Sequence, residues 1–309
     1  MSLKQKEEIT IWAFKDGKKG HEKQVEALIS ELSLYKKINL HEFEVWESHT
    51  SLPDLIIGAG NQTHKHILTA KKEHPSAISI VLMKPSLRPT QWFDIAVVPD
   101  FDTFYFTKPK NVITTRGVLS KYSERKIIPK TGLIVIGGKS RHYHFRKNVI
   151  NQQIEWILNN AYKDYQWKIT TSPRSPDLDI PSHSGNAKFY SWKDTTQDWL
   201  SNEMEQSEIT FLTPESVSVL YEALSTNTKA YAFHHEHHTD GQHGSKRNTK
   251  VTRNIDKLKK EGSIGYIDTK RFLLSRSVKD INLIHPKKNV HLREVKDVAS
   301  KVLKSLDSP

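Results

Sequence analysis

The chain has 309 residues, which is enough for two domains, and its 36% hydrophobic and 27% charged residues are typical of a folded soluble protein. It contains no cysteine, which excludes disulfide bonds and cysteine-based zinc or thiol chemistry. No apolar stretch approaches the roughly 20 residues needed to cross a bilayer. The N-terminal residues do not resemble a signal peptide, so we expect a cytoplasmic protein.

The positive charge is concentrated near the C-terminus. The net charge is +12, and the residues from Ser245 onward include 17 Lys or Arg against 7 Asp or Glu. Such a surplus suggests an anionic partner, namely nucleic acid, an acidic membrane or a phosphorylated substrate, although a solvated basic surface explains it equally well. We expect no nucleic acid, because the region lacks the mixture of aromatic and basic residues found in single-strand binders.

The first half of the sequence predicts a parallel α/β domain. A strand at residues 8–14 leads through KDGKKGH to a helix with apolar residues at Val25, Leu28, Ile29 and Leu32. Five further strands are predicted at residues 41–46, 54–57, 78–83, 95–98 and 111–115. Strands that alternate with helical segments indicate βαβ units and a parallel sheet.

The second half repeats this alternation after a predicted link at residues 119–131. Strands are predicted at residues 133–136, 166–171, 187–190, 209–212 and 230–233, and helices at 148–161 and over about the last 20 residues. The sequence therefore predicts two domains, residues 1–125 and 126–309, the second of which carries the basic segment. In open parallel sheets ligands bind beyond the carboxyl ends of the strands, where the polar turns of this chain lie.

A phosphate site is predicted in GLIVIGGKSRHY, residues 132–143. The apolar strand is followed at once by Gly137 and Gly138, which let the backbone approach a ligand, and then by Lys139, Ser140 and Arg141. The stretch is not a nucleoside triphosphate P-loop, because that pattern requires glycine where this chain has Leu133.

A second part of the same site is predicted at residues 209–227. Thr213 is a suitable helix N-cap before Pro214, and Ser216 lies near this end of the helix. Ser218 and Glu222 are four residues apart and so share one face. The N-terminus of this helix can bind a phosphate, and Glu222 can accept hydrogen bonds from the hydroxyls of a ribose. An ordinary capped helix with a solvated glutamate is the alternative interpretation.

The loops of the first half contain candidates for acid–base chemistry. Asp16, His21 and Glu22 are candidate general bases, because an attacking hydroxyl must lose a proton. Taken singly, each is more often a cap or a surface residue. The remaining polar and glycine positions at the strand ends, which we place on the acceptor side, are Gly17, Gly58, Gly60, Lys84 and Arg116.

Two further patterns suggest other functions. Tyr143 and Lys147 fit the YxxxK pair of short-chain dehydrogenases and of NAD-dependent nucleotide-sugar epimerases, but the glycine fingerprint after the first strand is incomplete. HHEHH at residues 234–238 suggests a metal site. Adjacent side chains of an extended segment rarely point at one ion, so we expect a solvent-exposed or substrate-facing loop and no bound metal.

Taken in order, seven segments resemble the mitochondrial-fission ELM family. They are DGKKGHEKQ, DLIIGAGNQTH, VLMKPSLRPTQWFDIAVVPDFD, ITTRGVL, IGGKSRHY, ITTSPRSP and TPESVSVLYEALST. The resemblance runs from about residue 10 to 230 and ends near Phe233. This family comprises plant mitochondrial-fission factors and bacterial proteins often found with lipopolysaccharide genes.

The resemblance implies the GT-B glycosyltransferase fold, in which two Rossmann-like domains face each other across a cleft, and we expect the C-terminal helix to cross back to the first domain. It also implies residue roles. Gly137 to Ser140 would hold a diphosphate with Arg141 nearby, Ser216 would contact a phosphate, and Glu222 the donor ribose. Asp16, Gly17 and His21 would line the acceptor side.

The expected function is metal-independent sugar transfer from a nucleotide-sugar to an envelope glycolipid or lipopolysaccharide-type acceptor. No cofactor is expected beyond that co-substrate, and the basic segment would hold the protein against an anionic surface, such as the inner membrane. The alternatives are a non-catalytic scaffold that acts at a membrane and the NAD-dependent epimerase.

Overall fold

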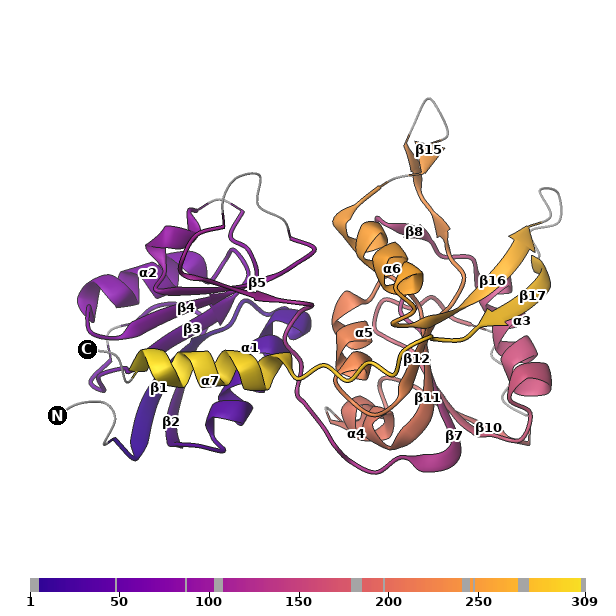
Figure 1. Cartoon of the computed structure of the whole chain (residues 1–309), viewed down its shortest axis with the longest axis horizontal. Helices are drawn as coiled ribbons and strands as arrows, with labels where there is room; N and C mark the ends of the chain where they lie inside the picture. The colour runs from indigo at the N-terminus through magenta and orange to yellow at the C-terminus, as the bar shows by residue number, and fades with distance from the viewer. Residues whose placement is uncertain are drawn as a thin grey trace. The chain divides into compact units, whose positions relative to one another are not determined.

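The computed structural model describes residues 6–47, 49–86, 88–102, 108–178, 185–196, 198–240, 245–246, 248–271 and 278–306. The chain forms two compact units (Figure 1). Unit 1 contains Met1–Tyr122 and Arg293–Pro309, and unit 2 contains Ser123–Leu292. Within the described ranges, no helix is both long enough and apolar enough to cross a membrane.

Unit 1 is built on a six-stranded parallel sheet in the order β2-β1-β3-β4-β5-β6. Its strands are β1 (Glu8–Phe14), β2 (Lys37–Phe43), β3 (Leu55–Ala59), β4 (Ile78–Leu82), β5 (Ile95–Pro99) and β6 (Val112–Thr115). Its helices are α1 (Lys19–Leu32), α2 (His64–Glu73), the short 3-10 helix η2 (Thr90–Trp92) and α7 (Glu294–Leu306). The predicted parallel sheet is confirmed. The edge strand β2 begins four residues earlier than predicted, because its exposed, largely polar sequence gives a weak apolar pattern.

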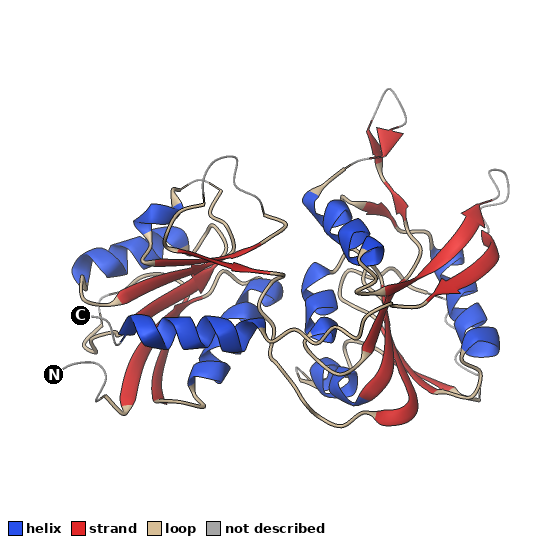
Figure 2. Ribbon diagram, in the orientation of Figure 1, coloured by secondary structure: helices blue, strands red, loops and turns tan. Residues whose placement is uncertain are grey.

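Helices cover both faces of this sheet (Figure 2). Successive residues of β1 point to opposite faces, as in any strand. Ile11 and Ala13 belong to the core with α1 and α7, whereas Trp12 and Phe14 belong to the core on the α2 face. Burial on both faces explains why β3, β4 and β5 are almost continuously apolar.

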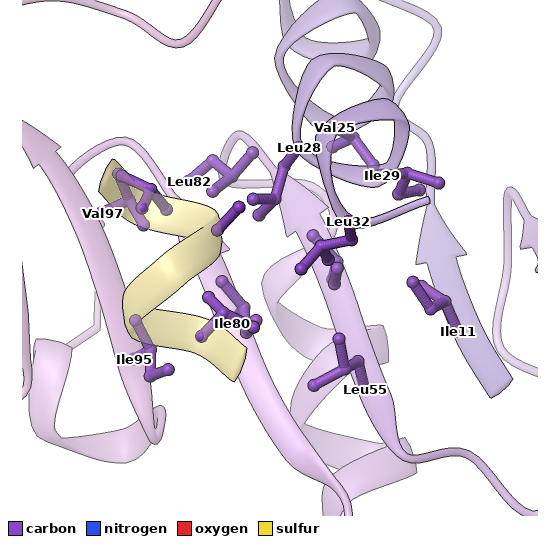
Figure 3. Packing of buried hydrophobic residues seen from close by; sticks show 14 of the residues in the cluster. Ile11, Val25, Leu28, Ile29, Leu32, Leu55, Ile80, Leu82, Ile95 and Val97 are labelled. Carbon is purple, nitrogen blue, oxygen red and sulfur yellow. The ribbon is translucent and has the colours of Figure 1, made fainter. Parts of the chain in front are cut away.

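The C-terminal helix α7 belongs to unit 1. Its buried side chains Val295, Val298, Ala299, Val302 and Leu306 recur at helical spacing. Four of these, all except Val295, lie in the same core as Leu28 and Leu32 of α1. Figure 3 shows α7, in yellow, beside Ile80, Leu82, Ile95 and Val97. The expectation that the last helix returns to the first domain is confirmed, and the assignment of residues 293–309 to the second domain is corrected.

Unit 2 is built on a seven-stranded sheet in the order β10-β9-β7-β11-β12-β16-β17. Its strands are β7 (Ile128–Val135), β9 (Gln166–Thr170), β10 (Ala187–Tyr190), β11 (Ser207–Leu212), β12 (Lys229–Ala232), β16 (Gly265–Arg271) and β17 (Val278–Ile284). All neighbours are parallel except β16 and β17. The first six strands in chain order therefore follow the 3-2-1-4-5-6 arrangement of the Rossmann fold. The predicted link at residues 119–131 ends inside β7.

The remaining elements of unit 2 are helices and short strand pairs. The helices are α3 (Lys147–Trp156) with its π-helical continuation η3 (Ile157–Ala161), α4 (Trp199–Gln206), α5 (Val217–Leu224) and α6 (Lys250–Lys260). The short pairs are β8 (Tyr143–His144) with β13 (Glu236–His237), and β14 (Thr239–Asp240) with β15 (Ser245–Lys246). The sequence analysis did not predict α4, α6, β16 or β17.

Each sheet has a point where the strand order reverses direction. In unit 1 this switch point lies between β1 and β3, and in unit 2 it lies between β7 and β11. The loops that leave the two strands at such a point diverge, and the resulting crevice is where open α/β sheets bind ligands. Asp16, Gly17 and Gly60 follow β1 or β3, and Gly137 to Arg141 and Thr213 follow β7 or β11.

The burial of α7 predicts a large and local effect of mutation. Val302→Asp would place a charge without a partner in the core of unit 1, where Val302 is fully buried. We expect a loss of about 3–5 kcal/mol in the free energy of unfolding. The neighbouring Lys301→Asp changes an exposed position of the same turn and is expected to have little effect. Urea unfolding measures both, and equal stability of the two variants would contradict the assignment of α7 to the core.

Candidate functional site

The crevice of unit 2 is closed at its base by hydrogen bonds between the loops after β7 and β11. The Gly137 N–H donates to Thr213 Oγ1 at 2.7 Å, and the Gly138 N–H donates to Glu215 Oε1 at 2.9 Å. These are the two N–H groups that the sequence analysis assigned to a diphosphate. They are engaged by the chain's own side chains, so a diphosphate would meet them only after Thr213 and Glu215 moved.

Both glycines are required by packing. A Cβ atom on Gly137 would lie 1.6 Å from Glu215 Oε1, and one on Gly138 would lie 1.9 Å from the carbonyl oxygen of Arg174. Real Cβ contacts are never this short, so any side chain at either position would displace the loop. The sequence analysis predicted a close backbone approach at these glycines, and the approaching groups are parts of the protein itself.

Glu215 is the residue that the sequence analysis missed. It is only 7% exposed, and its Oε1 also accepts a hydrogen bond from Thr213 Oγ1 at 3.0 Å. Its other oxygen, Oε2, is buried and has no hydrogen-bond partner among the described residues. Burial raises the pKa of the Glu215 carboxyl, and hydrogen bonds from Thr213 and from backbone N–H groups offset this only in part. An acidic residue between a buried strand and a helix was the available signal.

The polar side chains after Gly138 have two different roles. Ser140 Oγ accepts hydrogen bonds from the N–H groups of His142 and Tyr143, each at 3.2 Å, so it holds the shape of its own loop. Lys139 and Arg141 are exposed on that loop. These two cations therefore remain the candidates for contacts with an anion in this crevice.

Helix α5 begins later than predicted. Its N-cap is Ser216 rather than Thr213, because Thr213 Oγ1 bonds to the β7 loop and the backbone of Thr213 and Pro214 lies outside the helix. The Ser216 side chain makes no capping hydrogen bond within α5. Ser216 and Ser218 are half-buried at the N-terminal end, where partial positive charge favours anions.

Glu222 is buried rather than solvated. It is 8% exposed, and its Oε1 accepts a hydrogen bond from Ser201 of α4. Six residues separate it from Ser216, which corresponds to about 9 Å along the helix axis. A ribose at Glu222 would therefore have to compete with Ser201 for the carboxylate.

The crevice of unit 1 contains a carboxylate–histidine pair. The Asp16 side chain is fully buried, and its Oδ2 lies 2.7 Å from Nδ1 of His21. Because a carboxylate only accepts, Nδ1 carries the proton and Nε2 of the neutral ring is left as an acceptor. The His21 side chain is 22% exposed, so the pair is open to solvent on the imidazole side.

Gly60 makes room for this pair. It has φ of +86°, and a Cβ atom there would lie 2.3 Å from His21 Nδ1 and 2.7 Å from Asp16 Oδ2. Gly17, with φ of +74°, forms the turn between Asp16 and α1. The structure therefore brings Asp16, Gly17 and His21, which follow β1, together with Gly60, which follows β3.

The other predicted positions of unit 1 lie elsewhere. Gly58 is inside β3, where a Cβ atom would meet Thr63 and Ile67 of the following segment, so its role is packing. Glu22 is half-buried in the first turn of α1. Lys84 follows β4, the neighbour of β3. Arg116 follows β6, three strands or about 14 Å from β3, and its N–H donates to Glu294 at 3.0 Å, so it does not join the pair.

The histidine-rich segment supports the β7 loop. Strand β13 pairs with β8, and His238 Nε2 lies 3.1 Å from the carbonyl oxygen of Ser140. Arg146 donates to Glu236 at 3.0 Å, which ties the same two segments together. Among the residues placed by the structure, no group of three or more His, Cys, Asp or Glu side chains is arranged to hold a metal ion.

The YxxxK interpretation does not fit this geometry. That pair needs both side chains one turn apart on a single helix, but Tyr143 lies in β8 and Lys147 is the first residue of α3. Tyr143 is 3% exposed, and burial raises the pKa of its hydroxyl, whereas a catalytic tyrosine needs a lowered pKa.

Residues 19–306 match the sequence family described as mitochondrial fission ELM1. The chain belongs to this family. The predicted resemblance is confirmed, and it continues past Phe233 through the His-rich and Lys-rich segments, where the sequence analysis placed its end. No curated protein sequence matches the chain significantly.

Solved structures of similar fold include three with low sequence identity. A UDP-glucosyltransferase from Polygonum tinctorium that glucosylates indoxyl has 7% identity and a TM-score of 0.51, over 98% of this chain and 94% of its own. A Listeria monocytogenes protein assigned as a UDP-N-acetylglucosamine 2-epimerase has 9% identity and a TM-score of 0.51, over 97% and 90%. An Arabidopsis thaliana protein solved with UDP has 8% identity and a TM-score of 0.50, over 98% and 91%. These matches show the two-Rossmann-domain GT-B fold.

The buried carboxyl of Glu215 predicts a pH dependence of stability. Because its pKa is raised above the ordinary value of 4.5, the folded protein keeps a proton that the unfolded chain releases. The contribution of this bound proton to the stability of the folded protein is therefore present below about pH 4.5 and is lost as the pH rises through the raised pKa of Glu215. Glu215→Gln preserves the acceptor for Gly138 and removes the titration.

We expect the Glu215→Gln variant to be more stable than the wild type above this pH window and to converge with it below. Denaturant unfolding at a series of pH values measures the difference. Parallel stability profiles for the two proteins would show that Glu215 does not titrate with a raised pKa.

Proposed function

We propose that the chain is a glycosyltransferase that binds a nucleotide-sugar in unit 2 and its acceptor in unit 1. The observation that carries the proposal is the Asp16–His21 pair, a buried carboxylate 2.7 Å from a partly exposed imidazole at the switch point of unit 1. Family membership supports it, and so do the names of proteins with the same fold, which include a UDP-glucosyltransferase and a protein complexed with UDP.

In the proposed reaction His21 is the general base. Its Nε2 takes the proton of the acceptor hydroxyl while that oxygen bonds to the anomeric carbon of the donor, and the bond from this carbon to the diphosphate oxygen breaks. Asp16 holds the imidazole in the required tautomer and stabilises the imidazolium that forms. This arrangement uses side chains that the fold has already oriented.

The leaving diphosphate would be stabilised in unit 2 without a metal ion. Lys139 and Arg141 supply positive charge from the β7 loop, and the N-terminus of α5 with Ser216 supplies partial charge and a hydroxyl. Glu222 would bind the ribose. For the acceptor we propose an envelope glycolipid of the lipopolysaccharide type, on the basis of the family resemblance alone.

One observation favours a different function. Thr213 and Glu215 occupy the N–H groups of Gly137 and Gly138, and an acidic side chain at this place opposes the binding of an anion. A non-catalytic GT-B protein that binds a partner would tolerate this closure. Nucleotide binding separates the two functions, because only the transferase requires it.

The first test is a thermal-shift experiment with UDP, GDP, CMP and ADP on the full chain. We expect a rise in the melting temperature with at least one nucleotide, and a smaller rise for a Lys139→Ala, Arg141→Ala double variant. If no nucleotide raises it, the donor site is refuted. If one binds but neither sugar transfer nor donor hydrolysis follows with any sugar, the scaffold is favoured.

The role of His21 predicts a loss of turnover without a loss of donor binding. His21→Asn is expected to lower the rate of transfer by about 10²–10⁴-fold, the usual contribution of general base catalysis. Asp16→Asn should act in the same direction, because it removes the carboxylate that sets the tautomer. The nucleotide affinity of both variants should equal that of the wild type, since the nucleotide is proposed to lie in unit 2.

Glu22→Gln is the matched control for this experiment, because Glu22 is the next residue of α1 and the third candidate base. Its rate should stay within a few-fold of the wild-type rate. If Glu22→Gln abolishes transfer and His21→Asn does not, the base is Glu22 and the assignment of the Asp16–His21 pair is wrong.

We also propose that helix α6 carries the surface for anionic membranes. Lys250, Arg253, Lys257 and Lys260 are exposed and recur at helical spacing, so they lie along one face. Lys259 does not belong to this face, because it is half-buried with its ammonium 5.0 Å from the Tyr266 ring centroid. The peripheral location at the inner membrane rests on this surface.

Charge reversal on α6 tests the membrane surface. Arg253→Glu, Lys257→Glu and Lys260→Glu together should weaken binding to vesicles containing phosphatidylserine by a hundredfold or more, at about 1 kcal/mol per basic residue. The control is Lys163→Glu with Lys188→Glu, two exposed positions of unit 2 outside α6, one in the turn before β9 and one in the edge strand β10. Equal vesicle binding by both variants would refute the role of α6.

A further inference from the structure

Unit 2 contains a second concave site that the proposed function does not use. It is a pocket of about 320 Å³, and the polar side chains that line it are Thr228, Lys229, Tyr231, Ser263, His285, Lys287, Lys288 and Asn289. Its volume lies within the range of about 300–1,000 Å³ that is usual for small-molecule sites. All of its lining residues belong to unit 2.

The pocket lies at the amino ends of the parallel strands, whereas the β7–β11 crevice lies at their carboxyl ends. Lys229 is the first residue of β12, and Ser263 lies two residues before the start of β16. His285 follows the end of β17, which runs antiparallel to β16 and so ends beside the start of β16. The crevice lies beyond the carboxyl ends of the parallel strands, so the length of β12, about 13 Å, separates the two sites.

The pocket is lined by basic side chains. Among the described residues, its lining includes three lysines and a histidine, and no Asp or Glu. Lys229 has Glu208 at 3.7 Å, a long ion pair that neutralises one lysine only in part. Lys287 and Lys288 are exposed at the rim, where their ammonium groups can turn toward a bound anion.

The two rim lysines start from a fixed backbone. The N–H groups of Lys287 and Lys288 both donate to the carbonyl oxygen of Gly262, at 2.9 and 3.1 Å. Gly262 has φ of +68°, and a Cβ atom there would lie 2.6 Å from Lys287 Cβ. The turn is therefore held in one conformation, and a ligand would not have to order the backbone before it is bound.

His285 adds an oriented donor. The Tyr162 hydroxyl donates to the Tyr231 hydroxyl at 3.2 Å, so the Tyr231 proton is directed to Nδ1 of His285, 2.8 Å away. In the neutral ring the proton then lies on Nε2, which becomes a hydrogen-bond donor. The chain of tyrosines thus selects the tautomer that suits an anion.

We propose that this pocket is a binding site for a small phosphomonoester with a carbon body of about the size of a sugar. The ammonium groups and the His285 N–H match the oxygens of a phosphate, which carries close to two negative charges at neutral pH. Leu224, Ala230, Pro286 and Val290 supply the apolar part of the wall, against which the carbon body packs. The site goes beyond the proposed transferase and does not depend on it.

The test is isothermal titration of the full chain with glucose 6-phosphate, inorganic phosphate and glucose as probes. We expect glucose 6-phosphate to bind, inorganic phosphate to bind more weakly, and glucose to show no binding. In a Lys287→Gln, Lys288→Gln double variant the affinity for glucose 6-phosphate should fall at least tenfold, and His285→Phe should lower it further by removing the N–H donor.

The control variant is Lys163→Gln with Lys188→Gln, two exposed lysines in the turn before β9 and in the edge strand β10, which should bind as the wild type does. Lys139→Ala with Arg141→Ala removes the cations of the crevice and should also leave the binding unchanged. The proposal is overturned if neither phosphate-containing probe binds, if the Lys287, Lys288 variant binds as well as the wild type, or if the crevice variant abolishes binding. Failure of nucleotides to bind would refute the transferase and leave this site untouched.

Discussion

The hydrogen bonds between the loops after β7 and β11 are the constraint on which the unit 2 site depends. The loops that follow the two strands of a switch point run in opposite directions. Without hydrogen bonds between these loops, the buried N–H groups at their bases would have no partner. Thr213 and Glu215 accept these N–H groups. The same bonds keep Thr213 out of α5, whose N-cap is Ser216, and Lys139 and Arg141 are exposed on the loop that follows Gly138.

In both units a carboxylate at the switch point packs against a glycine, but the strands that these two residues follow are exchanged. In unit 1 the carboxylate of Asp16 follows the first strand, β1, and the glycine that makes room for it, Gly60, follows β3. In unit 2 the glycine, Gly137, follows the first strand, β7, and the carboxylate of Glu215 follows β11. Each switch point thus joins a side-chain carboxylate to a backbone that has no Cβ. The difference lies in the partner, because Asp16 faces an imidazole and Glu215 faces N–H groups.

Most of the fold followed from the sequence because buried parallel strands are almost continuously apolar, and β3, β4 and β5 carry that pattern. The parts that did not follow have physical causes. Helix α6 exposes a basic face and buries polar Thr252 and Asn254 beside Ile255 and Leu258, so its apolar stripe is short. Strands β16 and β17 lie at the edge of the sheet with several charged residues. The unit to which α7 belongs depends on contacts with α1 some 270 residues away, which no local pattern contains.

The sequence predicted where the candidate site lies in the chain, but not which groups contact one another there. A glycine pair after a strand indicates a close approach, but not which group approaches. Local sequence favours a ligand, while the structure places Glu215 there. Likewise, Thr213 before Pro214 has the sequence of an N-cap, but its hydroxyl accepts a hydrogen bond from the buried N–H of Gly137 instead of capping α5. The pairing of Asp16 with His21 was within reach of the sequence, because both lie in one short loop and helix start.

The protonation state of Glu215 decides how the unit 2 crevice can receive an anion. An ionised carboxylate a few ångströms from a diphosphate would repel it, strongly so in a medium that water does not screen. Burial favours the neutral form, whose Oε2 becomes a donor and can face a phosphate oxygen without repulsion. Oε2, which has no hydrogen-bond partner among the described residues, is therefore the atom through which a neutral Glu215 would contact the anion of the proposed donor. A neutral Glu215 would not repel an anion, although the N–H groups of Gly137 and Gly138 stay engaged by Thr213 and Glu215.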